Sequence, residues 1–168
     1  ETSVLKKILS DLSIEAETEA APIESVPVII PSAIETLFVR AFVSNILKAA
    51  PWKMIQSGLG DLLGKVSSLL EWKLGVAIFD EYFCQEAYDL VENVLNDLIN
   101  NSGKIIAREK EGLEILTKGL IYSGVSMMMV GSSRPASGSE HHISHFLDMY
   151  AGIFKKSVPT HGIKVGTA

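Results

Sequence analysis

The sequence predicts an α+β fold, in which an incomplete α/β segment at residues 1–49 precedes a mainly all-helical domain at residues 50–168. Two observations predict this division. Apolar residues recur at helical spacing from Pro51 onward, whereas the first fifty residues combine one helical stripe with a short apolar run bounded by prolines. The apolar fraction of 47% with 21% charged residues is that of a globular protein.

The first segment carries two predicted elements. Residues 3–12 have the apolar spacing of a helix, and residues 26–31 form a run of valines and isoleucines between Pro27 and Pro31, typical of a short buried strand. A single strand cannot complete a sheet. We therefore expect the chain to be part of a longer protein.

The second segment is predicted to be helical almost throughout. Pro51 is placed to open a helix, and amphipathic helices are predicted at residues 81–100 and 112–129. The glycine- and serine-rich tract at 131–138 interrupts the pattern before another helix, and residues 161–168 resemble the start of one more.

Composition restricts the setting and the partners of the protein. A formal charge of −5 argues against a nucleic-acid partner, because phosphate-binding surfaces are usually basic. The single cysteine, Cys84, cannot close an internal disulfide, and we interpret it as a core residue in a reducing cytoplasm. No basic and apolar signal segment and no apolar run of about 18 residues is present, which predicts a soluble, cytoplasmic protein.

All four histidines lie near the end of the chain, at His141, His142, His145 and His161. On a helix, His141 and His145 would project from the same face, and Ser137 with Glu140 matches a capping box that would start this helix. The spacing resembles the H-E-x-x-H zinc signature, but His142 replaces its catalytic glutamate. Metal binding is therefore compatible with the pattern and proteolysis is not, while ordinary surface or core histidines remain an alternative.

Asp61 is the available carboxylate partner for these histidines. It lies in an apolar, glycine-rich run at residues 58–65, where an acid is costly to bury unless a metal ion or another charge pairs with it. A helix cap, or an ion pair with Lys65 four residues on, explains Asp61 equally well. The run does not form a phosphate-binding P-loop, because its glycine spacing is one residue short and Val66 replaces the required Ser or Thr.

The segment from Gly131 to His145, with its serine, proline and histidine pattern, resembles the motif of sn-glycerol-1-phosphate dehydrogenases. This family lies in the superfamily of iron-containing alcohol dehydrogenases and dehydroquinate synthases. Residues 50–75 are similar to the family's segment around its first metal ligand, and residues 161–167 to its last ligand motif. The resemblance covers residues 50–168.

The resemblance implies roles for individual residues. It makes Asp61, His141 and His161 the metal ligands, and it places His145 near the substrate, in proton transfer or hydrogen bonding. It also implies substrate contacts for Asp61 and Ser137. The family's glycine-rich cofactor loop is absent from these residues, so no cofactor-binding residue is predicted.

The resemblance also implies a function for the complete protein. Residues 1–49 would be a remnant of the N-terminal nucleotide-binding domain, and residues 50–168 a helical metal-binding catalytic domain truncated at its C-terminus. The expected reaction interconverts dihydroxyacetone phosphate and sn-glycerol 1-phosphate, using NAD or NADP and a divalent metal, zinc first, with nickel or iron as alternatives. We also expect a homo-oligomer with no membrane partner.

Three alternatives remain open at this stage. The enzyme could be a glycerol dehydrogenase or another polyol dehydrogenase or dehydroquinate synthase relative, the chain could be a helical metal-binding module without redox activity, or the metal could be purely structural. We further hypothesise that the loop at 132–138 binds an anionic part of a ligand at a helix N-terminus. A simple capping turn is the competing interpretation.

Overall fold

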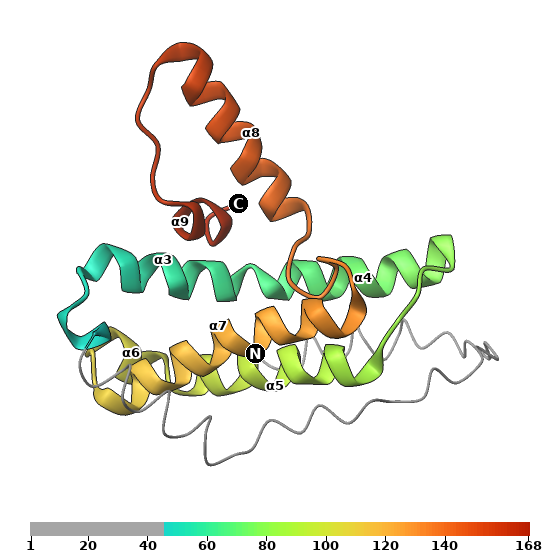
Figure 1. Cartoon of the computed structure of the whole chain (residues 1–168), viewed down its shortest axis with the longest axis horizontal. Coiled ribbons are helices and arrows are strands. Elements are labelled where there is room, and N and C mark those ends of the chain that lie inside the picture. The colour runs from blue at the N-terminus through green and yellow to red at the C-terminus, as the bar shows by residue number, and fades with distance from the viewer. Residues whose placement is uncertain (1–45) are drawn as a thin grey trace.

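The computed structural model describes residues 46–168, and within this part of the chain every regular element is helical (Figure 1). The predicted helix at 3–12 and strand at 26–31, and with them the α/β part of the expected fold, lie outside the described residues. The elements are η1 (Leu47–Ala49), α3 (Trp52–Leu63), α4 (Lys65–Phe79), α5 (Gln85–Asn100), α6 (Ser102–Ile106), α7 (Lys110–Val130), α8 (Ser139–Phe154) and α9 (His161–Val165).

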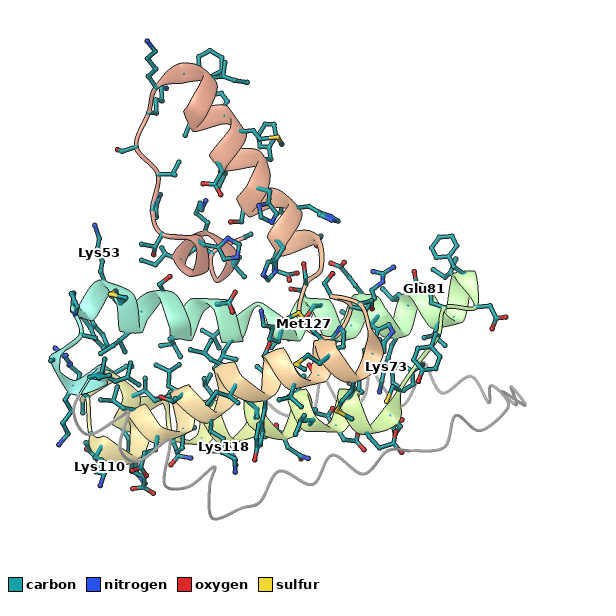
Figure 2. All side chains as sticks on the ribbon, in the orientation of Figure 1. Lys53, Lys73, Glu81, Lys110, Lys118 and Met127 are labelled. Atoms are coloured by element: carbon teal, nitrogen blue, oxygen red, sulfur yellow. The ribbon has the colours of Figure 1, made fainter. Side chains whose placement is uncertain are left out.

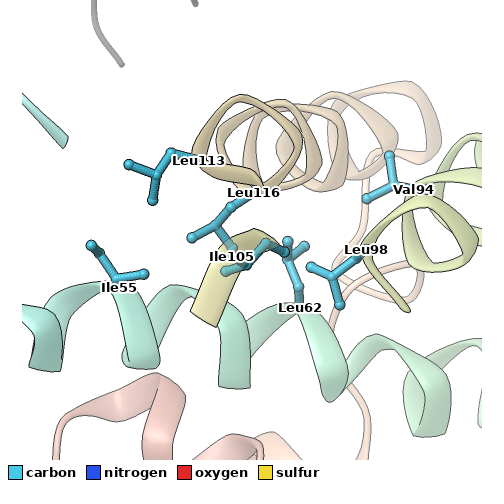
Figure 3. Packing of buried hydrophobic residues seen from close by; sticks show 7 residues of the cluster. All are labelled: Ile55, Leu62, Val94, Leu98, Ile105, Leu113 and Leu116. Carbon is cyan, nitrogen blue, oxygen red and sulfur yellow. The ribbon is translucent and has the colours of Figure 1, made fainter. Parts of the chain in front are cut away.

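Helices α3, α5, α6 and α7 form a bundle around the first hydrophobic cluster. In Figure 3 its side chains point inward from these four helices: Ile55, Leu62, Val94, Leu98, Ile105, Leu113 and Leu116. Charged side chains such as those of Lys53, Lys110 and Lys118 point outward (Figure 2). This is the arrangement that apolar residues at helical spacing produce, because each helix buries one stripe and leaves the other in water.

A second cluster holds α4 against α5. Its members are Leu69, Trp72, Ala87, Tyr88, Val91 and Leu95, with the half-buried Cys84 packed at the edge. Trp72 is fully buried, and its indole N–H donates to the backbone carbonyl of Tyr82 at 3.0 Å. This bond fixes the connection between α4 and α5, on which the orientation of α4 depends.

The helix bounds agree with the sequence prediction at one place and differ at another. Helix α7 contains the predicted 112–129 and ends at Gly131, whose φ of 70° lies in the left-handed region that favours glycine. The prediction that a helix begins at residue 81 was wrong. Asp80 ends α4 at a φ of 53°, and α5 begins only at Gln85, because residues 81–84 cross between the two helices.

Helix α7 is also, among the described residues, the one helix that is long and apolar enough to cross a membrane. That test considers length and composition only, and the core helix of a soluble protein passes it equally well. In this structure α7 packs against α3, α5 and α6 and contributes Leu113 and Leu116 to the core. About a third of its most apolar stretch is buried in this core (33%).

Helices α8 and α9 form the part of the fold that creates the site. Helix α8 leaves the bundle next to α4, and the chain then returns through residues 155–160 so that α9 lies on α3 (Figure 1). The contact between α3 and α9 is made by glycines: a side chain on Gly60 would overlap the carbonyl oxygen of Gly162, and one on Gly162 would overlap the backbone of Ser57. The two backbones therefore approach more closely than side chains would permit.

Candidate metal centre

Three side chains from three different helices meet where α8 and α9 approach the end of α3. Asp61 lies in the last turn of α3, His141 in the first turn of α8, and His161 is the first residue of α9. One potential ligand atom from each lies within 4.8 Å of the other two. The structure thus places together the residues that the family resemblance implied.

The distances between these atoms suit a divalent ion. The Nε2 atom of His141 is 3.4 Å from Oδ1 of Asp61, and Nε2 of His161 is 3.9 Å from the same oxygen. Donors about 2.0–2.2 Å from a tetrahedral zinc ion are separated from each other by roughly 3.4 Å. Two imidazoles and one carboxylate are also a donor set that zinc, nickel and iron accept. The three residues therefore fit such an ion.

Each of the three side chains also contacts another residue, through the atom that does not face the other two candidate ligands. The ammonium of Lys65 donates to Oδ2 of Asp61 at 3.2 Å, and Nδ1 of His141 lies 2.8 Å from Oε1 of Glu140. Nδ1 of His161 is 3.2 Å from the hydroxyl of Ser144. These contacts use the outer atom of each side chain, so that Oδ1 and the two Nε2 atoms face one another.

The position of Asp61 is compatible both with an ion pair to Lys65 and with metal binding, which the sequence left open as alternatives. Asp61 pairs with Lys65 at i+4, and its other oxygen faces the imidazoles. Lys65 is itself buried, and burial lowers its pKa, while the charges of Asp61 and Glu140 raise it in opposition. Its ammonium balances one of the two carboxylates around the site.

Burial differs sharply among the candidate ligands. The side chain of His141 is only 11% exposed, whereas that of His161 is 45% exposed, so the group of three is open to solvent on the α9 side. Burial lowers the pKa of His161, as does the neighbouring His141, and Asp61 acts in the opposite direction. A lowered pKa favours neutral imidazole, which is the form that binds metal ions.

The histidines at the start of α8 occupy different positions. The ring of His145 is exposed, and its centroid lies 5.6 Å from that of His161, one turn beyond His141. His145 lies beside the group of three but is not one of its members, so the pair four residues apart does not itself form the cluster. His142 is exposed and points away from the shared face.

The start of α8 differs from the predicted capping box. The helix begins at Ser139 with Gly138 as its N-cap, and Ser137 does not cap it. Glu140 instead accepts a hydrogen bond from the backbone N–H of Gly138 at 2.7 Å, and Glu71 of α4 accepts one from the N–H of Ser139. Two donors that an anionic ligand could use at this N-terminus are thus occupied by carboxylates, which weakens the anion-site hypothesis for this loop.

Glu140 was considered in the sequence only as a cap, and the structure gives it further contacts. It is 3% exposed, and its Oε2 atom accepts a hydrogen bond from the hydroxyl of Ser67 at 2.7 Å. Burial would raise its pKa, but the hydrogen bonds from Ser67, His141 and Gly138 outweigh this effect and lower the pKa. A carboxylate directly before a candidate metal ligand is the sequence signal that could have indicated the contact of Glu140 with His141.

The amino-acid sequence of the chain is similar to those of named dehydrogenases. No family model matches the chain. The chain is 38% identical over 124 residues to the glycerol-1-phosphate dehydrogenase [NAD(P)+] of Halalkalibacterium halodurans, an alignment that covers 74% of this chain and 31% of that protein. It is 40% identical to the protein of the same name from Bacillus licheniformis over 122 residues, which are 73% of this chain and 30% of the relative.

The chain fits the glycerol-1-phosphate dehydrogenase family. The likeness extends beyond these organisms, because the family's protein from Hyperthermus butylicus is 35% identical over 123 residues, 72% of this chain and 35% of that protein. The chain spans about a third of the length of the curated relatives that it matches. The family resemblance inferred from residues 50–168 is confirmed.

Proposed function

We propose that this chain belongs to a metal-dependent, NAD(P)-linked dehydrogenase that interconverts dihydroxyacetone phosphate and sn-glycerol 1-phosphate by hydride transfer. The observation that carries the proposal is the convergence of Asp61, His141 and His161 in a chain whose relatives bear the name glycerol-1-phosphate dehydrogenase [NAD(P)+]. The cytoplasmic location, the homo-oligomer and the absence of nucleic-acid and membrane partners stay predictions.

The proposed centre would assist the reaction by electrostatics. A divalent ion there, zinc first and nickel or iron next, would supply Lewis acidity toward the substrate oxygen at the reacting carbon. Asp61 and the two imidazoles would hold the ion in place, and the open side next to His161 would admit the substrate. The hydride chemistry belongs to the nicotinamide cofactor, and the protein supplies position and field.

His145 is our candidate for proton transfer. Its exposed ring lies beside His161 and one helical turn from His141, so it can reach a ligand at the open side of the group. In the reduction direction it would donate a proton to the substrate oxygen, and in the oxidation direction it would accept one. Ser137, half-buried in the preceding loop, is the second proposed substrate contact, together with Asp61.

The test compares two neighbouring histidines in the full-length protein. His141→Ala should lose stoichiometric zinc, because two remaining ligands hold a divalent ion poorly, and should lose activity with it. His142→Ala is the matched control, since His142 is exposed and outside the group of three. Retention of one zinc per chain in His141→Ala, measured by elemental analysis, would overturn the assignment.

Glycerol dehydrogenase activity is the main alternative within the same superfamily. Side-by-side assays with sn-glycerol 1-phosphate, glycerol and the dehydroquinate synthase substrate distinguish the possibilities. We expect the highest kcat/KM for the phosphorylated polyol. A preference for glycerol would retain the metal site and replace the substrate.

A module without redox activity, or a purely structural metal, would be distinguished by two measurements. Titration of the full-length protein with NADH and NADPH should show cofactor binding, which a simple metal-binding module would lack. A chelator should remove the metal within minutes without unfolding the helices, because His161 is largely exposed. Unfolding in step with metal loss would instead indicate a structural site.

A further inference from the structure

Glu140 is a buried carboxylate in direct contact with a candidate metal ligand. Glu140 is 3% exposed and directly precedes His141 in α8. Its Oε1 atom lies 2.8 Å from Nδ1 of the His141 imidazole. A buried acid is costly unless its oxygens are hydrogen-bonded. The hydrogen bonds of Glu140 therefore show which groups offset the cost of burying its carboxylate.

Both oxygens of Glu140 are fixed by donors from separate segments. Oε1 accepts from the backbone N–H of Gly138 at 2.7 Å, and Oε2 accepts from the hydroxyl of Ser67 in α4 at 2.7 Å. These two bonds set the position of the carboxylate without help from His141. The carboxylate is thus a rigid acceptor toward which the imidazole is oriented.

The contact determines where the proton of a neutral His141 resides. A carboxylate accepts hydrogen bonds and cannot donate one, so at 2.8 Å the proton must lie on Nδ1. The other nitrogen, Nε2, then carries the lone pair, and it faces Oδ1 of Asp61 at 3.4 Å. A free histidine side chain favours the opposite tautomer, in which Nε2 is protonated and cannot bind a metal ion.

We propose that Glu140 is a positioning residue that holds the proton of His141 on Nδ1 and thereby presents Nε2 as a preformed ligand. This inference rests on the proposed metal site and names the group that orders it before the ion binds. Residues that orient metal-binding histidines in this way typically contribute a factor of about 10–100 to metal affinity.

Helix capping is the competing explanation for Glu140, and the chain contains a matched control. Glu71 also accepts a hydrogen bond from a backbone N–H at the start of α8, that of Ser139 at 2.9 Å, and it contacts its hydroxyl as well. Glu71 has no contact with His141 or Asp61 among the hydrogen bonds of the described residues. A residue that only caps α8 should therefore behave as Glu71 does.

The first experiment measures zinc affinity by chelator competition in the full-length protein. Glu140→Ala should weaken zinc binding about 10–100-fold, and Glu71→Ala should change it less than about twofold, although both variants lose thermal stability. Glu140→Gln should recover part of the affinity, because its amide oxygen can still accept from Nδ1 and its amide nitrogen can donate to Ser67. Equal losses of affinity in Glu140→Ala and Glu71→Ala would overturn the proposal.

The second experiment reads the tautomer without any metal. In the metal-free wild-type protein at about pH 8, above the usual histidine pKa, ¹⁵N shifts of His141 should show a protonated Nδ1 and an unprotonated Nε2. A wild-type His141 protonated on Nε2 would overturn the inference even if zinc binds. If zinc does not bind to the wild type, the proposed function fails, and the tautomer measurement still decides the role of Glu140.

Discussion

The close backbone contact between α3 and α9 can be tested by adding a single methyl group to Gly60. The Cβ of Gly60→Ala would overlap the carbonyl oxygen of Gly162 and lie 3.0 Å from its carbonyl carbon. These atoms belong to backbone, which cannot rotate aside as a flexible side chain does. Helix α9 must therefore move away from α3, and it carries His161 with it.

The expected magnitude follows from two opposing effects. Overpacking of this kind costs about 1–3 kcal/mol, and replacing a helical glycine by alanine regains about 0.5–1 kcal/mol, which leaves a net loss of about 0–2.5 kcal/mol. Gly124→Ala in α7 isolates the second effect, because no atom lies within 4 Å of its added Cβ. The difference between the two variants should thus be about 1–3 kcal/mol.

Displacement of α9 should also affect metal binding. Nε2 of His161 is already 3.9 Å from Oδ1 of Asp61, and a longer separation moves it out of reach of an ion held by the other two ligands. We expect zinc affinity to fall about tenfold or more in Gly60→Ala, an effect the size of losing a supporting contact, and to be unchanged in Gly124→Ala. Urea unfolding and zinc competition measure the two effects. If Gly60→Ala matched Gly124→Ala in both, the reasoning about this contact would be refuted.

Three further predictions concern separate parts of the structure. His145→Ala should reduce kcat about 100–10,000-fold with full zinc content, and a normal rate would contradict a role in proton transfer. Trp72→Phe should cost about 1–3 kcal/mol in denaturant unfolding followed by circular dichroism, because it leaves a void and removes the hydrogen bond to Tyr82, while zinc affinity should not change. In the metal-free folded protein, the pKa of His161 lies below the ordinary histidine value of 6.5. Below pH 6.5 the unfolded chain therefore binds more protons than the folded chain, so the free energy of unfolding should be full above that pH and fall as the pH drops toward the lowered pKa. His161→Asn should flatten this part of the stability curve, and an equally steep decline in both proteins would contradict the expected shift.

Local sequence patterns predicted local structure well and helix ends less well. The spacing of apolar residues located the helix at 112–129, because one buried stripe repeats within the helix itself. The start predicted at residue 81 was wrong, since the hydrogen bond from Trp72 to the carbonyl of Tyr82 fixes an extended connection there. The predicted Ser137 cap was wrong for a similar reason: carboxylates from α4 and from Glu140 take the first N–H groups of α8.

The sequence by itself determined the helical character of the described part, the likeness to glycerol-1-phosphate dehydrogenases, and the types of side chain that could bind a metal. Spacing alone paired His141 with His145, because residues four apart on a helix must share a face. The family resemblance implied that Asp61 and His161 share a site. Only the tertiary structure decided the distance between them, and that Lys65, Glu140 and Ser144 contact the three candidate ligands. The physical reason is that these positions depend on the close contact of α3 with α9, where Gly60 and Gly162 allow the two backbones to meet. Helical periodicity relates residues within one helix only, so it cannot predict a contact between helices far apart in the chain.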